Sequence, residues 1–180
     1  MVGVGAKGED QQQPDAVQRL WSPWRMAYIR DPRRQATGCV FCDKPGRGAE
    51  HDRDSLILYR GELIYVILNA YPYNPGHLMV VPFRHVAGFE ELSADELGEL
   101  GRLSQRAVRA LRRSSHPEAF NLGINVGALA GAGIADHIHQ HVVPRWAGDT
   151  NFMPVIGHTR VLPELLEETY DRLRPVFAES

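Results

Sequence analysis

Apolar positions along this chain recur with two different periods, and the two periods predict different elements. Ser55–Tyr59 and Leu63–Leu68 are short apolar runs rich in β-branched and aromatic residues, separated by Arg60-Gly61-Glu62. This arrangement is typical of a β-hairpin. Leu78–Pro82 and Phe120–Val126 are further runs of the same kind, each next to turn-forming residues. We therefore expect at least four strands before residue 127.

Two segments carry the spacing of helices instead. Ser93-Ala94-Asp95-Glu96 has the sequence of a capping box, and leucines and alanines follow it at every third or fourth position. This predicts a long amphipathic helix over residues 93–114. Similar spacing predicts a C-terminal helix over residues 163–177. Strands joined by short turns, with one long helix between them, predict an α+β domain in which an antiparallel sheet of about five strands packs against the two helices.

Domain boundaries follow from where the apolar periods begin. Residues 1–18 contain several glycines and a Gln11-Gln12-Gln13 run and show no apolar period, so we expect a disordered leader. Residues 19–180 then form a single domain, with a core at about 38–150. Gly38–Glu50 is rich in glycine and proline, which predicts a loop.

Composition excludes several classes of partner. The chain has 180 residues, is 43% hydrophobic and carries a net charge of −2, so it offers one sizeable core and no basic field for nucleic acid. No apolar run approaches the ~18 residues that a membrane span needs, and the N-terminus does not resemble a secretion signal. There are only two cysteines, in one C-x-x-C, which is typical of a redox pair or half a metal site in the cytoplasm.

Three of the eight histidines stand at alternate positions: His137, His139 and His141. On a helix the middle ring would point away from the other two, whereas on a strand all three line one face. The intervening Ile138 and Val142 favour a strand. We therefore expect a strand over residues 138–143 that ends where Pro144 has no N–H to donate. A surface strand with polar residues facing outward is the alternative.

Two kinds of chemistry suit such a row of imidazoles. The rings can ligate a metal, although the three positions span ~13 Å, which is wide for one zinc ion. Alternatively, the middle ring is a nucleophile toward phosphorus, since neutral imidazole is abundant at pH 7. The glycine-rich segment Gly127–Gly133 lies just before the histidines and can present backbone N–H groups to an anion. It matches neither a P-loop nor a Rossmann motif. We favour the nucleophile.

At this point the chain resembles the histidine triad superfamily of nucleotidyl hydrolases and transferases. The resemblance rests on His137-x-His139-x-His141-Val142-Val143 and covers about residues 38–150. Further motifs agree in order, namely Asn69, Asn74–Pro82, Asn125-x-Gly127 and Gly131. The flanks Ser22–Met26 and Val143–Trp146 are similar to the actinobacterial branch of diadenosine polyphosphate phosphorylases, near the fragile-histidine-triad hydrolases.

The resemblance implies a role for each matching residue. His139 would be the nucleophile that forms a nucleotidyl-imidazole intermediate, His141 would donate to the α-phosphate, and His77 and His137 would support them. Asn69 would hold a ribose hydroxyl. The positions implied around the phosphates are Asn125, Gly131, Ala132 and Gly133. Trp146 would stack on a base, across a subunit interface, or pack in the core. No cofactor is required for this chemistry.

One departure from the family pattern concerns the acceptor. The hydrolase branch has glutamine followed by serine or threonine where this chain has Ala132-Gly133, which favours phosphate over water. The expected reaction is phosphorolysis of diadenosine tetraphosphate to ADP and ATP. A dinucleoside polyphosphate hydrolase, a purine nucleoside phosphoramidase and a non-catalytic nucleotide-binding regulatory module are the alternatives. The resemblance also implies at least a homodimer, built partly by the helix at 93–114.

The resemblance gives the cysteine pair a role as well. Some bacterial members bind a structural zinc through such a pair, a histidine after the third strand and the first histidine of the triad. Here these ligands would be Cys39, Cys42, His85 and His137. Two thiolates and two imidazoles suit a closed tetrahedral zinc site, which would fix His137 beside the nucleophile. The alternative is a pair of reduced structural thiols.

Overall fold

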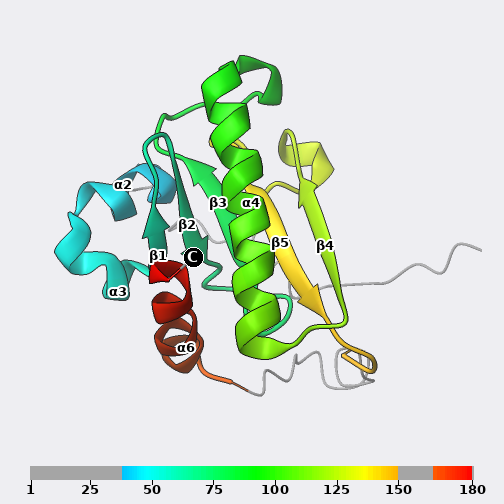
Figure 1. The fold of residues 1–180 in the computed structure, drawn as a ribbon. Coiled ribbons are helices and arrows are strands. Elements are labelled where there is room, and N and C mark those ends of the chain that lie inside the picture. Colours follow the sequence, from blue (N-terminus) through cyan, green and yellow to red (C-terminus); the bar gives the residue numbers. More distant parts are fainter. Residues whose placement is uncertain (1–37, 150–163, 180) are drawn as a thin grey trace, which may run out of the picture.

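Five antiparallel strands form one sheet in the order β1-β2-β3-β5-β4 (Figure 1). This computed structural model describes residues 38–149 and 164–179. The strands are β1 (Ile57–Arg60), β2 (Ile64–Leu68), β3 (Leu78–Pro82), β4 (Ala119–Ile124) and β5 (Gln140–Arg145). Each neighbouring pair is antiparallel, so the long connection between β3 and β4 is where the chain crosses the sheet.

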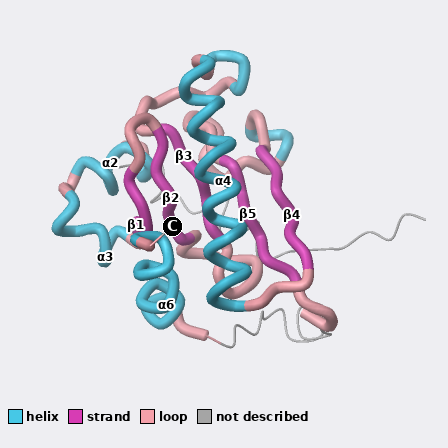
Figure 2. Tube along the Cα trace, in the orientation of Figure 1, coloured by secondary structure: helices cyan, strands magenta, loops and turns pink. Residues whose placement is uncertain are grey.

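Helices cover the sheet unequally (Figure 2). The α-helices are α2 (Val40–Gly46), α3 (Asp52–Ser55), α4 (Ala94–Ser115) and α6 (Leu166–Ala178), and the 3-10 turns are η2 (Ala49–His51), η3 (Phe89–Glu91) and η4 (Ala128–Ala130). The long helix α4 runs across one face, with α6 beside it. This confirms the predicted α+β architecture. Within the described residues, no helix is long and apolar enough to span a bilayer.

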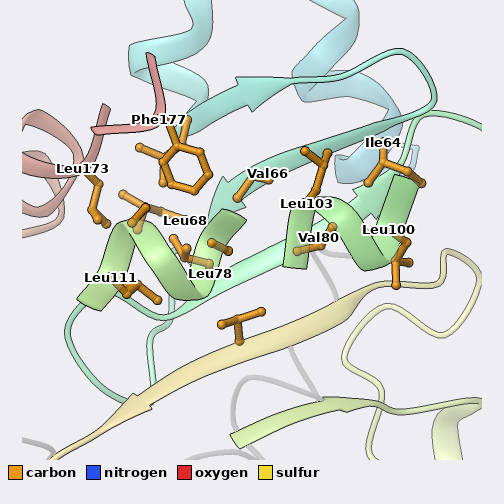
Figure 3. Packing of buried hydrophobic residues seen from close by; sticks show 14 of the residues in the cluster. Ile64, Val66, Leu68, Leu78, Val80, Leu100, Leu103, Leu111, Leu173 and Phe177 are labelled. Carbon is orange, nitrogen blue, oxygen red and sulfur yellow. The ribbon is translucent and has the colours of Figure 1, made fainter. Parts of the chain in front are cut away.

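The central strands β2 and β3 are buried on both faces, so their sequences are continuously apolar rather than alternating. One face packs under α4 and α6 in the larger core (Figure 3). That core contains Leu58, Ile64, Val66, Leu68, Leu78, Val80, Leu100, Leu103, Leu111, Val142, Leu173 and Phe177. The opposite face packs a smaller cluster made of Phe41, Ile57, Tyr65, Ile67, Met79 and Val81. The histidines lie on this second face.

The start of α4 is fixed by the capping box that the sequence predicts. The Ser93 hydroxyl accepts a hydrogen bond from the Glu96 N–H, and the Glu96 carboxylate accepts one from the Ser93 N–H at 2.8 Å. Arg84 then donates two hydrogen bonds to the same buried carboxylate, at 2.8 and 2.9 Å. Arg84 holds the pKa of Glu96 down to about 2. The carboxylate therefore ties the segment after β3 to the first turn of α4.

Substituting Glu96→Gln is expected to lower the free energy of unfolding by about 2 kcal/mol at pH 7, because charge-assisted hydrogen bonds are lost. The folded pKa of Glu96 lies below its ordinary value of 4.5. Its contribution is therefore complete above that value and disappears as the pH falls toward about 2. Urea unfolding at pH 7 and at pH 3 measures this. Asp95→Asn, exposed in the same turn, is the control; an equal loss there would refute the assignment.

The segment predicted as a loop over Gly38–Glu50 is instead largely helical, and this prediction was wrong. Pro45 lies inside α2, where it cannot donate the N–H that would normally reach the carbonyl of Phe41. That carbonyl accepts a hydrogen bond from the buried Tyr65 hydroxyl at 2.7 Å instead. A hydrogen bond from the sheet thus replaces the helical hydrogen bond that Pro45 cannot make, and this long-range partner is not visible in the composition of the segment.

The boundaries predicted for the histidine strand also need correction. β5 begins at Gln140 rather than Ile138, and it continues through Pro144 to Arg145. Pro144 lies opposite Phe120, while its carbonyl accepts a hydrogen bond from Asn74 on the other side. In a strand the N and the C=O of one residue point to the same side. The missing N–H of Pro144 therefore faces away from β4, and the ladder is not interrupted.

Other predicted boundaries hold to within a few residues. The capping box begins α4 where expected, the fourth strand ends at Ile124 rather than at Val126, and the C-terminal helix runs from Leu166 to Ala178. The predicted leader at residues 1–18 lies outside the described residues, so the domain limits remain a prediction.

Candidate active site

The three histidines of the motif lie on the sheet face opposite α4. Ile138 and Val142 belong to the core under α4, so the alternate residues between and beside them point the other way. The His139 and His141 rings are edge-to-face, with centroids 4.9 Å apart. His137 and His139 are both buried. The structure therefore brings the three rings to one face, although His137 and His139 come before the strand begins.

His139 is held in one orientation by a backbone carbonyl. Its Nδ1 lies 2.9 Å from the carbonyl oxygen of His137, and a carbonyl can only accept. Nδ1 must therefore carry the ring proton, which leaves the lone pair on Nε2. Burial lowers the pKa of His139, while the hydrogen bond to the carbonyl partly opposes this shift. The ring is neutral at pH 7, which is the nucleophilic form of imidazole.

Phe41, which lies in α2, packs against two of the histidines. Its ring centroid lies 4.9 Å from that of His139 and 5.5 Å from that of His137. The ring is buried, and it contributes an apolar wall beside His139 that helps to keep this imidazole out of water. Phe41 was not among the predicted site residues, because its segment was expected to be a loop. Its position between the two cysteines was the available signal.

His77 joins the cluster from the loop between β2 and β3. It is fully buried, and its Nε2 lies 2.9 Å from Nδ1 of His141. Tyr73, from the same loop, packs its ring on both, with centroids 4.7 Å from His77 and 6.0 Å from His141. Asn69 contacts Nδ1 of His77 at 3.3 Å. The sequence placed His77 at the site but did not indicate the part that Tyr73 takes.

A polar clamp holds this loop against β5. The buried Asn74 side chain donates to the carbonyl of Pro144 at 2.9 Å and to the carboxylate of Asp149 at 2.7 Å. Arg145 donates two hydrogen bonds to the same carboxylate, at 2.6 and 2.9 Å. Hydrogen bonding from Arg145 keeps the pKa of Asp149 far below its usual value, so the clamp stays charged throughout the physiological range. Sequence reasoning missed Asp149.

Next to the imidazoles, the two cysteines and two histidines predicted as metal ligands converge. The Nδ1 of His137 lies 3.3 Å from Sγ of Cys39 and 3.6 Å from Sγ of Cys42. The Nδ1 of His85 lies 3.4 Å from Sγ of Cys42. The four ligand atoms all lie within 4.8 Å of one another. In a tetrahedral zinc site, the distance between a sulfur ligand and a nitrogen ligand is about 3.5 Å, which agrees with these values.

The protonation of this set also fits a metal. The Nε2 of His137 donates to the carbonyl of Pro82 at 2.9 Å, so Nδ1 bears the lone pair that faces the thiols. Burial lowers the pKa of His137 to about 4, so this ring is neutral at pH 7. Burial and the neighbouring Cys39 raise the pKa of the Cys42 thiol to about 11. A bound cation reverses this effect on thiols, because it stabilises thiolate.

The glycine-rich segment forms a short exposed turn at η4. Gly127 and Gly131 have φ angles of +81° and +87°, which glycine adopts without strain. The N–H groups of Ala130 and Gly131 donate to carbonyls within the turn. These two amides are therefore bonded inside the turn, and the phosphate-binding role of the segment stays a prediction. Ala132 and Gly133 follow in the segment that leads to His137.

Two predicted nucleotide-binding residues, Trp146 and Asn125, stand at opposite ends of the β4–β5 pair. The indole N–H of Trp146 donates to the carbonyl of Ser115 at 3.3 Å, at the end of α4. Trp146 is thus docked toward the helix face of the sheet, not stacked over the imidazoles of its own chain. Asn125 follows β4 and is half-buried. No contact in the structure tests the role of either residue.

Comparison with known proteins identifies similar sequences and similar folds. The HIT domain profile matches residues 50–148. An AP-4-A phosphorylase of Mycobacterium tuberculosis is 46% identical over 164 residues, covering 87% of this chain and 83% of that protein. A zinc-bound histidine triad family protein from Mycobacterium smegmatis is 31% identical, with a TM-score of 0.63 over 79% of this chain and 94% of that one.

A second solved structure extends the likeness. It is a hypothetical histidine triad nucleotide-binding protein from Sulfolobus tokodaii, 27% identical, with a TM-score of 0.60 over 78% of this chain and 90% of that one. The imidazole row on one sheet face, the five-stranded antiparallel sheet and the profile match agree with one another. The chain therefore belongs to the HIT domain family, the histidine triad proteins.

Proposed function

We propose that this protein is a nucleotidyltransferase that cleaves diadenosine tetraphosphate by phosphorolysis. The observation that carries the proposal is the fixed orientation of His139, whose Nδ1 is held on a carbonyl so that Nε2 bears the lone pair. Similarity to an AP-4-A phosphorylase over most of both chains supports the choice of substrate. A binding module without turnover has no need of an oriented, neutral nucleophile.

The reaction proceeds in two displacements at one phosphorus. Nε2 of His139 attacks an α-phosphorus of the dinucleotide, the bond from that phosphorus to the bridging oxygen breaks, and ATP leaves. The adenylyl group is now bonded to His139. An oxygen of inorganic phosphate then attacks the same phosphorus, the phosphorus–nitrogen bond breaks, and ADP leaves. Ala132-Gly133, where the hydrolase branch has polar side chains, supports phosphate rather than water as the acceptor.

Product analysis of diadenosine tetraphosphate with and without inorganic phosphate tests this function. ADP and ATP appearing only when phosphate is present is the expected result. AMP and ATP in phosphate-free buffer would instead identify a hydrolase on the same machinery. No turnover under either condition would exclude the substrate, and nucleoside phosphoramidates would be tested next. Mass spectrometry of acid-stable peptides is unsuitable for the phosphorus–nitrogen bond, so the intermediate is sought after alkaline quenching.

We also propose that Cys39, Cys42, His85 and His137 hold a structural zinc ion. The donor set, its distances and the neutral state of His137 support this ligand set. Zinc would fix the His137 backbone, whose carbonyl orients the nucleophile, and it takes no part in the displacements. A cytoplasmic location, where thiols remain reduced, suits such a site and remains our expectation.

We propose, further, that two copies associate through β4 and α4. β4 is the edge strand beside β5, and most of its residues are exposed. An apolar groove of about 570 Å³ lies between it and α4. Its exposed lining includes Phe89, Leu97, Leu122 and Val126. A second copy that adds its own edge strand and helix would bury this surface and pair the open strand.

Leu122→Glu is expected to convert the dimer to a monomer, because a carboxylate would be buried without a partner in the interface. Sedimentation velocity at micromolar concentration measures the change. Leu165→Glu, an exposed leucine beside α6 and outside the groove, is the matched control and should leave the dimer intact. A wild-type protein that sediments as a monomer would remove the proposal.

A further inference from the structure

We propose that the loop between β2 and β3 decides which nitrogen of His141 carries the ring proton. The loop acts through His77, which is a positioning residue, and the deciding group is the peptide N–H of Tyr73. The inference rests on the proposed function, because it assigns His141 as the hydrogen-bond donor to the phosphate. It names the groups that make His141 a donor, which neither the motif nor the comparisons supply.

Two donors converge on Nδ1 of His77. The backbone N–H of Tyr73 lies 3.1 Å from it, and an amide N–H can only donate. The side-chain amide of Asn69 lies 3.3 Å from the same nitrogen. Its oxygen accepts from the N–H of Tyr71 at 2.9 Å, so its NH₂ group is the part that faces His77. Nδ1 of His77 must therefore be an acceptor without a proton.

The proton positions of both rings follow from this. A neutral imidazole without a proton on Nδ1 carries it on Nε2. Nε2 of His77 lies 2.9 Å from Nδ1 of His141, so it donates there. Nδ1 of His141 then accepts, and the proton of His141 is on its Nε2. One peptide N–H thus sets the tautomers of two histidines in series, without any charge change.

The result is complementary to the tautomer of His139. The two rings are adjacent, with centroids 4.9 Å apart. Nδ1 of His139 donates to a backbone carbonyl, whereas Nδ1 of His141 accepts from His77, so the two Nε2 atoms differ in protonation. His139 presents a lone pair and His141 presents an N–H. A phosphoryl group needs both, because one nitrogen must attack phosphorus while a donor stabilises the oxygen charge that develops. Two lone pairs there would repel the anionic substrate.

The clamp described above keeps the deciding amide in place. Asn74 is the residue after Tyr73, and its side chain is bonded to the carbonyl of Pro144 and to Asp149. Pro144 lies on β5, the strand that also carries His141. The loop that supplies the Tyr73 N–H is therefore fixed to the same strand as the ring whose tautomer it sets.

Nitrogen-15 NMR of the wild-type protein tests the inference without any turnover. Long-range proton–nitrogen correlations report which ring nitrogen is protonated, and the His141 signals are identified by their loss in His141→Gln. The expected result is an unprotonated Nδ1 and a protonated Nε2 in both His77 and His141. A proton on Nδ1 of His141 would overturn the proposal, whether or not the enzyme is a phosphorylase.

A pair of variants then tests the link between the loop and catalysis. His77→Gln keeps an N–H that can reach Nδ1 of His141, whereas His77→Leu fills similar space without a donor. The leucine variant is expected to have a kcat about 10- to 100-fold below wild type, with KM within about threefold, and the glutamine variant to recover about tenfold of that loss. Thermal melting verifies that both variants fold.

Equal losses in the two variants, in proteins that melt alike, would show that His77 only fills space. Should the leucine variant not fold, the NMR result on wild type decides alone. Absence of diadenosine tetraphosphate turnover in wild type would sink the proposed function and leave the tautomer result standing, so the two failures are distinguishable.

Discussion

His139→Asn is expected to abolish turnover of diadenosine tetraphosphate while nucleotide binding persists. The asparagine amide can still donate to the carbonyl of His137, as Nδ1 does now, but it has nothing in the place of the nucleophilic Nε2. Loss of a nucleophile that forms a covalent intermediate costs at least about 10⁴-fold in kcat. Initial rates by chromatography and calorimetric titration with the dinucleotide provide the two measurements.

A matched control separates the site from a general effect of losing an imidazole. His116 is exposed at the end of α4 and has left-handed backbone angles, which asparagine adopts readily. His116→Asn should therefore retain both rate and stability. Activity of the His139 variant above about one per cent of wild type would rule out His139 as the nucleophile.

Removing the metal is expected to produce the largest change in stability. A ligand present at about a thousand times its dissociation constant stabilises the folded state by about 4 kcal/mol. For a chain of this size, that corresponds to a fall in Tm of about 10 °C when the metal is lost. Cys39→Ser and treatment with a strong chelator should both have this effect, and zinc should be found at about one equivalent per wild-type chain.

A control for this experiment lies in α2, next to Cys42. Asp43→Asn changes a neighbouring polar residue outside the ligand set and should preserve zinc content and Tm. Zinc, but not magnesium, should restore the melting temperature after chelation, because the donors are thiols and imidazoles. A purified protein that lacks zinc and melts at the same temperature with and without chelator would exclude the site.

The elements that the sequence predicted best are those whose local signals agree with their tertiary environment. Leu78–Pro82 was predicted as a strand from a run of apolar residues between turn formers, and β3 spans the same residues. Helix α4 begins where its capping box predicts, because Ser93 and Glu96 satisfy each other without distant help. Alternation of period two likewise placed the three imidazoles on one face.

The features that sequence reasoning missed depend on partners far along the chain. Helix α2 contains a proline, and the lost hydrogen bond to the Phe41 carbonyl is replaced by one from the hydroxyl of Tyr65, which is 24 residues from Phe41 in the sequence. The contact between the His77 and His141 rings is also non-local, since these residues are 64 positions apart in the sequence. No spacing rule reports that a backbone amide at Tyr73 lies against His77, or that Trp146 docks on the end of α4.

The pairing between β3 and β5 predicts the order in which this protein assembles. It consists of three residue pairs, and it joins a local meander, β1 to β3, to a second local unit, β4 and β5. His77 and the cysteines belong to the first unit and His137 to His141 to the second, so neither unit alone contains the whole candidate site. Non-local pairing is slow. Activity should therefore return after secondary structure in stopped-flow refolding, and simultaneous recovery would refute this order.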